Sequence, residues 1–333
     1  MLRDLDAFQS EFSCLPNYIL AKGSQPALIS VKDLIFDPVK VPLACPAPVE
    51  MGLGDITMLT DAFVPMLTYP EQASAEALPA LSSLLDSFAT HVTYCAVEID
   101  VPDLADRWGS SLMALPQMMA EVEGRSRRCA ADLLHHASML ESRLQAHSFT
   151  IRAAFADPGP AIAKQARHHD LSVFAMRDRS ADHQGIAENL IFGAGRPLIV
   201  VPERGGYSTG VTKIAIAWDG SPTAYGAIFD AIPLIANALE VTVLTASEDK
   251  KVPRASTDAL LGYLARHGAK PSLREVVSSK AGIGEDLQLS AALVDADMLV
   301  MGAYGHSRLR EFVLGGATAA VLFNPKMPVF LSR

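Results

Sequence analysis

Two glycine-bearing segments near the C-terminus carry the residue types best suited to chemistry. The first is MGAYG at residues 301–305, and nine residues separate it from the second, GGAT at residues 315–318. Because glycine lacks a Cβ, the backbone at Gly302 and Gly305 can turn sharply and approach a ligand closely. The amides of Gly315 and Gly316 would open a helix, whose dipole favours an anion. The pattern therefore predicts a phosphate cradle.

The elements that must position these glycines alternate regularly along residues 211–333. Short apolar runs stopped by turn residues indicate strands, and longer stretches with apolar side chains three or four apart indicate helices. We expect strands at 213–218, 240–246, 274–278, 297–304 and 328–332, and helices at 223–238, 255–267, 284–295 and after Gly316. Such alternation predicts a doubly wound parallel sheet. Ligands of these sheets gather outside the carboxyl ends of the strands.

Residues 51–203 repeat the same order in a diverged form, which indicates an internal duplication. We expect their strands at 55–61, 91–99, 149–157, 170–179 and 196–202, with Asp61 ending the first strand as Asp219 ends its counterpart. On this alignment the first copy carries 31 extra residues, and residues 125–147 predict a long helix. The expected domains are 51–203 and 211–333, joined by a linker at 204–210, and residues 1–50 fit neither copy.

The composition of the 333 residues argues against several classes of protein. The net charge of -9 disfavours non-specific binding to nucleic acid or to an anionic membrane, since either kind of binding requires clustered Lys and Arg. Four cysteines form no CxxC pair, and adjacent histidines at 135–136 and 168–169 point to different helix faces, so we expect no metal site. Neither a signal peptide nor a membrane-spanning stretch is evident. We therefore expect a cytoplasmic location.

The G-x2-G-x9-G spacing, the strand before it and the closing strand PVFLS at 328–332 resemble the universal stress protein (UspA-like) family, in its tandem two-domain form. The resemblance is close over 211–333 and loose over 55–203. It implies two doubly wound five-stranded parallel-sheet domains of the adenine nucleotide alpha hydrolase-like, Rossmann-like fold. It also implies an adenine nucleotide, ATP or ADP with Mg²⁺, as the ligand.

The nucleotide-binding positions of the family map onto this chain one by one. The resemblance implies that Asp219 lies by the ribose, that backbone near Ala246 meets adenine, and that Met301 walls the base. It implies that ribose and phosphates are lined by the glycines and the residues beside them, namely Gly302, Gly305, Gly315, Gly316, Ala317 and Thr318. The chain departs from the family at Gly316, where a Ser or Thr hydroxyl is expected, and Thr318 is the nearest substitute. Asp219 also suits a turn or a helix cap, and Met301 and Ala246 also suit a core.

The N-terminal copy lacks the first glycine segment. Ala175, Met176, Arg177 and Asp178 stand in its place, so side chains fill the approach path and a carboxylate repels phosphate. We expect one nucleotide per chain, bound by the C-terminal copy.

Two functions stay open at this point. The first is a non-enzymatic, nucleotide-responsive regulatory module in stress response, with slow ATP hydrolysis left undecided; the second is a scaffold for protein contacts that binds no nucleotide, which the missing hydroxyl favours. A nucleotidyltransferase or ATP pyrophosphatase is disfavoured because HxGH and SGGxDS motifs are absent. We also predict an intramolecular pseudo-dimer, with strand 197–202 beside strand 328–332, because pairing covers two edges. Homo-oligomers and an unknown protein partner are further expectations.

Overall fold

The computed structural model describes residues 59–101, 115–246, 252–304 and 316–333, all of which belong to one unit, Leu53–Arg333. Residues 1–50, Gly305 and Gly315 lie outside the described residues. The N-terminal half contains β1 (Asp61–Leu67), η2 (Ala75–Ala77), α1 (Leu78–Asp86), β2 (His91–Asp100), α2 (Leu115–Ser138), β3 (Gln145–Ala154), α3 (Gly159–Ala166), β4 (Leu171–Met176), α4 (Ala181–Asn189), η4 (Leu190–Ala194) and β5 (Leu198–Pro202). The C-terminal half contains β6 (Lys213–Trp218), α5 (Pro222–Asp230), α6 (Ile232–Ile235), β7 (Glu240–Ala246), α7 (Arg254–Arg266), β8 (Pro271–Val276), α8 (Ile283–Ala292), β9 (Met298–Gly302), α9 (Ala317–Phe323) and β10 (Val329–Ser332).

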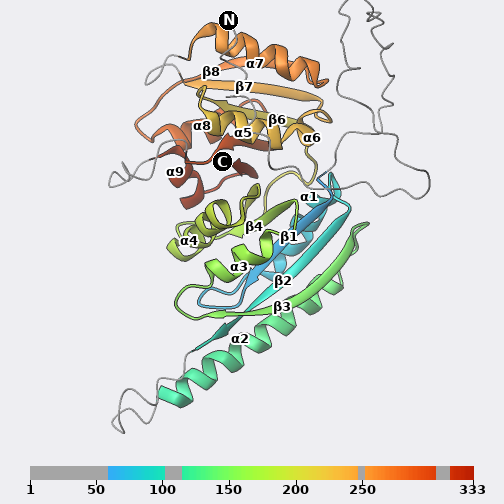
Figure 1. Ribbon diagram of the computed structural model, residues 1–333, viewed down its shortest axis with the longest axis vertical. Helices are drawn as coiled ribbons and strands as arrows, with labels where there is room; N and C mark the ends of the chain where they lie inside the picture. Colours follow the sequence, from blue (N-terminus) through green and yellow to red (C-terminus); the bar gives the residue numbers. More distant parts are fainter. Residues whose placement is uncertain (1–58, 102–114, 247–251, 305–315) are drawn as a thin grey trace, which may run out of the picture. The chain divides into compact units, whose positions relative to one another are not determined.

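All ten described strands form one sheet in the order β3-β2-β1-β4-β5-β10-β9-β6-β7-β8 (Figure 1). Each half supplies five parallel strands, and the halves meet where β10 pairs antiparallel with β5, Val329 opposite Val200 and Leu331 opposite Leu198. The predicted α/β fold of two doubly wound five-stranded halves is confirmed, and so is the predicted pairing of their last strands. Because each last strand covers the edge of the other, neither ladder is left open at the junction.

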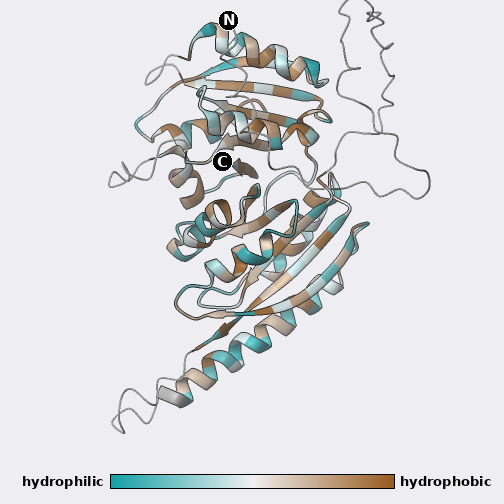
Figure 2. Ribbon diagram, viewed as in Figure 1, coloured by the Kyte–Doolittle hydropathy of each residue, from teal (hydrophilic) through white to brown (hydrophobic). Residues whose placement is uncertain are grey.

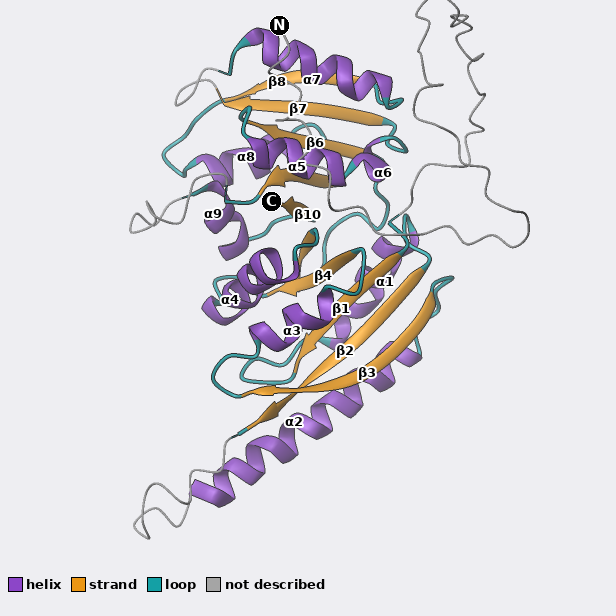
Figure 3. Cartoon of the chain, viewed as in Figure 1, coloured by secondary structure: helices purple, strands orange, loops and turns teal. Residues whose placement is uncertain are grey.

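Helices cover both faces of the sheet (Figure 3). Successive strand residues point to opposite faces, so Val64 joins the core under α1, α2, α5, α6 and α7, whereas Phe63 joins the core under α3, α4, α8 and α9. Figure 2 shows apolar residues along the central strands, which are buried on both faces, whereas most residues of the edge strands β3 and β8 are exposed. No helix within the described ranges is both long and apolar enough to cross a membrane.

A matched pair of aspartates shows how the two halves correspond. Asp170 Oδ2 accepts hydrogen bonds of 2.8 to 3.0 Å from the residues that open β1, Thr60 and Asp61. Asp297 Oδ2 accepts the same three bonds at 2.8 to 2.9 Å from Thr212 and Lys213, which open β6. Burial raises the pKa of both carboxyl groups, but these hydrogen bonds outweigh it and hold each pKa below its ordinary value.

This correspondence corrects the predicted first strand. Asp61 matches Lys213 and opens β1, so the expectation that Asp61 ends a strand, as the partner of Asp219, is wrong. Pro65 is tolerated inside β1 because the ladder with β4 covers only Ala62 and Phe63 and so does not need the amide that Pro65 lacks. The spacing to the matched aspartate is 109 residues in the first half and 84 in the second, which makes the first half longer by 25 residues between these points.

Two predicted helices differ from the observed ones. The helix expected at 125–147 is observed as α2, which begins at Leu115 and ends at Ser138. Residues 145–147, which the prediction included in that helix, belong to β3. The expected helix at 223–238 is divided into α5 and α6, because Pro233 takes the first turn of a new helix. The remaining expected elements of the C-terminal half agree with the structure within three residues at each end.

Candidate functional site

Three of the predicted site residues lie at the carboxyl ends of neighbouring parallel strands. Asp219 follows β6, Ala246 ends β7 and Gly302 ends β9, and these strands are adjacent in the order β9-β6-β7. The chain runs outward from β6 to β7 and β8 on one side and returns through β9 on the other. The point between β6 and β9 is therefore the topological switch of this half, where doubly wound sheets bind ligands.

Asp219 forms the turn between β6 and α5. Its Oδ1 accepts a 2.9 Å hydrogen bond from the Ser221 amide, and Gly220 beside it takes the left-handed conformation with φ of 74°. Ser221 caps α5, since its Oγ accepts from the Ala224 amide at 3.2 Å. Asp219 itself is exposed. Asp219 therefore has the turn position that the sequence allowed, and the turn holds its carboxylate at the carboxyl end of β6.

Gly302 is required by the packing of a helix. A Cβ there would lie 2.6 Å from the Ala224 amide nitrogen and 2.6 Å from the Thr223 carbonyl carbon, both in the first turn of α5. Such distances are too short for any side chain, so glycine lets α5 seat against the end of β9. Sequence reasoning explained Gly302 through ligand approach alone and missed this contact. Met301 before it is 4% exposed and part of the core, and Ala246 is half-buried.

The turn after β9 is held from two directions. Tyr304 has a φ of 51°, unusual for a residue with a side chain, and its amide donates a 3.2 Å hydrogen bond to Thr318 Oγ1 on α9. Its hydroxyl donates a 2.7 Å hydrogen bond to Glu188 Oε1 on α4 of the other half. Its ring lies 5.0 Å from that of Phe192. Thr318 is 5% exposed, so its hydroxyl already supports the turn.

The start of α9 carries no side-chain cap among the described residues. Gly316 is the N-cap, with φ of -74° and ψ of 151°, an extended conformation that any residue can adopt. Among the described residues, no atom lies within 4 Å of the place that a Cβ at Gly316 would take. Ala317 follows as the first helical residue and packs closely on α8, because a Cβ at Gly284 would lie 2.7 Å from the Ala317 carbonyl oxygen. The first turn of α9 is thus fixed on α8, while the position before it is open.

The N-terminal half differs from the C-terminal half in the same region. With the aspartates aligned, Ala175 matches Gly302 and Arg177 matches Tyr304. Ser180 is the N-cap of α4, as Gly316 is of α9, and its Oγ accepts from the His183 amide at 3.2 Å. Only two residues separate Arg177 from this cap, whereas eleven separate Tyr304 from Gly316. The helix that follows is longer in the N-terminal half, where α4 has 9 residues and is continued by η4 with 5, whereas α9 has 7.

Ionic groups occupy the end of β4 in the N-terminal half. Arg177 donates to both carboxylate oxygens of Glu203, at 2.8 and 3.2 Å, and to the Gln72 carbonyl at 2.9 Å. Its amide donates to Nδ1 of His183, which is 1% exposed, and Nε2 of that ring lies 3.7 Å from Glu71. Burial lowers the pKa of His183, although Glu203 and Glu71 oppose this effect. A phosphate group could bind at this position only by displacing the paired side chains of Arg177 and Glu203.

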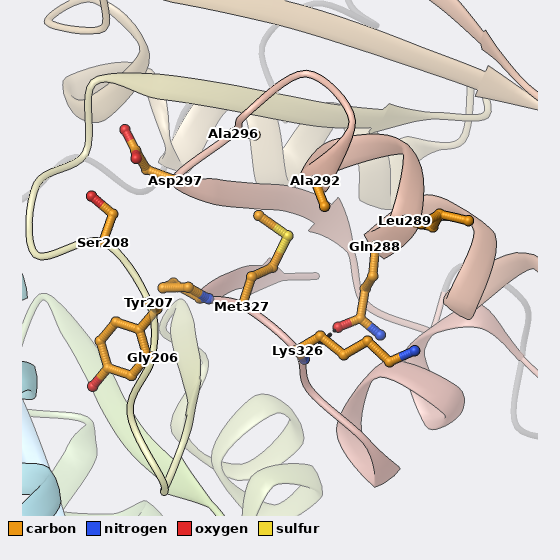
Figure 4. Close-up of a pocket in the computed structure, with 11 residues that line it drawn as sticks. Gly206, Tyr207, Ser208, Gln288, Leu289, Ala292, Ala296, Asp297, Lys326 and Met327 are labelled. Carbon is orange, nitrogen blue, oxygen red and sulfur yellow. Dashed lines mark hydrogen bonds between the residues drawn. The ribbon is translucent and has the colours of Figure 1, made fainter.

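A cavity of about 240 Å³ lies elsewhere in the C-terminal half (Figure 4). It is at the amino ends of β9 and β10, because Asp297 and Pro328 immediately precede those strands. Its other walls come from α8 and from the segment that joins the halves, including Gln288 and Tyr207, and the Lys326 amide donates a 2.7 Å bond to Gln288. None of the predicted site residues lines this cavity.

Comparisons with known proteins match the chain to one family. The model of the universal stress protein family matches residues 210–333. Universal stress protein Slr1230 of Synechocystis sp. (strain ATCC 27184 / PCC 6803 / Kazusa) is 30% identical over 148 residues, 44% of this chain and 50% of that protein. The chain thus spans about half the length of the curated relative that it matches.

Solved structures extend the likeness of fold across both halves. A universal stress protein from Archaeoglobus fulgidus DSM 4304 covers 81% of this chain and 96% of its own, with a TM-score of 0.60 and 15% identity. A universal stress protein in complex with cAMP is 23% identical over 37% of this chain and 97% of its own, with a TM-score of 0.30. The universal stress protein family is thus matched by residues 210–333 of this chain, and the likeness of the N-terminal half is one of fold.

Proposed function

We propose that the C-terminal half binds one adenine nucleotide, ATP or ADP, at the carboxyl ends of β6, β7 and β9. The protein then acts in stress response as a nucleotide-responsive regulatory module and catalyses no reaction of its own. The observation that carries this proposal is the contrast between the halves at matched positions. In the N-terminal half, Arg177 pairs with Glu203 at the end of β4 and Ser180 caps α4. In the C-terminal half, Gly302 stands at the position of Ala175, and Gly316 is the N-cap of α9 at the position of Ser180 and has no side-chain hydroxyl.

Each predicted residue has a place in this proposal. Asp219 receives the ribose, the backbone at Ala246 receives adenine, and Met301 supports the base from the core. The phosphates lie against the amides that open α9, where Gly316 and Ala317 offer no competing side-chain cap. Gly305 and Gly315 complete the cradle in the proposal, and Thr318 supports it through the Tyr304 amide.

The residues at the proposed site fit a nucleotide that binds as its Mg²⁺ complex. No group of three or more His, Cys, Asp or Glu side chains in the described part of the chain could hold a metal ion. Mg²⁺ commonly binds through substrate phosphates and one or two carboxylates, and it keeps several waters. Mg²⁺ would therefore arrive with the phosphates, and Asp219 is a carboxylate at this end of the sheet that could bind it.

The proposed setting follows from the same features. We place the protein in the cytoplasm, and we propose that assembly into homo-oligomers and contact with a protein partner transmit the nucleotide signal. The linker at 204–210 joins the domains 51–203 and 211–333 in this proposal, and the β5–β10 ladder holds them together within one chain.

The experiment that tests nucleotide binding changes only the charge at the cradle. Gly316→Asp and Gly316→Asn both supply good N-caps at an open, extended position, so both variants keep α9. The carboxylate of Gly316→Asp repels phosphate, and we expect at least a 10-fold loss of ATP affinity in calorimetry, whereas Gly316→Asn has a much smaller effect. Ser180→Asp is the matched control in the N-terminal half and leaves ATP affinity unchanged.

The outcomes separate the two functions that the sequence left open. Nucleotide in the denatured supernatant of the purified protein, detected by mass spectrometry, supports the proposal. Absence of any ATP or ADP binding by the parent protein contradicts it and leaves the ligand-free scaffold as the better function. Equal ATP affinity in the parent and the Gly316→Asp variant places the nucleotide away from α9.

A further inference from the structure

The N-terminal half has no glycine segment where the C-terminal half has residues 301–305, and the helix that follows its β4 contacts the end of β9 at Tyr304. Glu188 in α4 and Phe192 in η4 both contact Tyr304, the second of the two residues between Gly302 and Gly305. The guanidinium of Arg333, at the end of the chain, lies 4.9 Å from the centre of the Phe192 ring. One of the anchors of the β9 turn therefore comes from a segment more than 100 residues away in sequence.

The backbone of the β9 turn depends on these anchors. Left-handed angles are unfavourable for a residue with a side chain, so Tyr304 keeps its φ of 51° only while its surroundings hold it. Thr318 holds the amide of Tyr304 and Glu188 holds its hydroxyl. A further contact joins the two halves nearby, because the Arg179 amide, which lies just before α4, donates a 2.7 Å hydrogen bond to the carbonyl of Phe323, the last residue of α9.

We propose that Tyr304 couples the nucleotide site of the C-terminal half to helix α4 of the N-terminal half. The bond to Glu188 holds the β9 turn in the conformation that the nucleotide requires, which lowers the ordering cost of binding. By thermodynamic linkage, a bound nucleotide stabilises the same bond and tightens α4 against the C-terminal half. Tyr304 is a positioning residue in this proposal, and the proposal rests on nucleotide binding by the C-terminal half.

The test compares four proteins: the parent, Tyr304→Phe, Glu188→Ala and the double variant. Tyr304→Phe removes one hydroxyl and keeps the ring beside Phe192. We expect each single variant to bind ATP about 3- to 10-fold more weakly, with no further loss in the double variant because both changes delete the same hydrogen bond. Tyr263→Phe is the matched control, because Tyr263 lies in α7 and its ring contacts His267, the C-cap of that helix. We expect this variant to bind ATP with unchanged affinity.

Hydrogen exchange supplies a readout that a purely structural role would not move. Addition of ATP to the parent slows exchange of the α4 amides, residues 181–189, and this protection is lost in Tyr304→Phe. If the parent binds ATP but Tyr304→Phe binds equally well and α4 exchange does not respond, the coupling is wrong while nucleotide binding stands. If the parent binds no nucleotide, both proposals fail. Additive losses in the double variant also overturn the coupling.

Discussion

Substitution of Gly316 by serine restores the hydroxyl that the C-terminal half lacks at its proposed phosphate cradle. The structure removes the main objection to this change. Gly316 has φ of -74° and ψ of 151°, and a Cβ there has open space, so the penalty of about 1 to 2 kcal/mol for a left-handed residue does not apply. The N-terminal half shows the geometry that the introduced serine would adopt, because Ser180 at the matched position accepts from the amide three residues later.

The expected magnitudes differ for folding and for binding. The new cap contributes a few tenths of a kcal/mol to the free energy of unfolding, and the loss of glycine freedom in the unfolded chain adds about 0.4 to 1 kcal/mol. A serine hydroxyl can accept from the helix amide and donate to phosphate at the same time. A hydrogen bond to a charged group contributes about 1.5 to 3 kcal/mol, which corresponds to roughly 10- to 150-fold tighter ATP binding.

Calorimetry with ATP and urea denaturation of the Gly316→Ser variant measure the two quantities separately. Higher stability with unchanged ATP affinity would refute the placement of phosphate at α9, because the cap forms without a ligand to contact. Thr318→Ser is a better companion than Thr318→Val, since it keeps the hydroxyl that accepts from Tyr304. Thr318→Val leaves that amide unpaired and weakens binding even if Thr318 never touches phosphate.

Three further predictions concern stability and are measured by urea denaturation. Gly302→Ala places a Cβ 2.6 Å from backbone atoms of α5 and lowers the free energy of unfolding by about 1 to 3 kcal/mol, whereas Gly226→Ala, whose nearest neighbour lies at 3.6 Å, does not lower it. Arg177→Met leaves the carboxylate of Glu203, which is 7% exposed, without its main partner and costs about 3 kcal/mol; a cost below 1 kcal/mol would contradict this. The lowered pKa of Asp297 predicts stability that is fully present above its ordinary pKa, near 3.8, and is lost as the pH falls through the lower folded value. Asp297→Asn therefore shows a shallower loss of stability in acid than the parent does, and equal slopes would refute the role of its three hydrogen bonds.

Much of the fold was accessible from the sequence because it depends on local pattern. Apolar runs and turn residues placed most strands, and the alternation of strands with helices required parallel ladders. The pairing of β5 with β10 followed from the need to cover two edges. The first strand was expected at 55–61 but runs from Asp61 to Leu67, and only the three-dimensional register, in which Ala62 pairs with Leu171, shows this.

The sequence by itself determined which segments could form a glycine-lined site and at which end of the sheet they lie. It could not determine why Gly302 must be glycine, since the atoms that exclude a Cβ belong to α5, far from it in the chain. Nor could it find the bond between Tyr304 and Glu188, which joins residues 116 positions apart. Periodicity and turn chemistry report on neighbours along the chain, whereas these contacts exist only once the sheet has brought distant helices together. The tertiary structure alone therefore decided that Tyr304, beside the proposed site, contacts both halves.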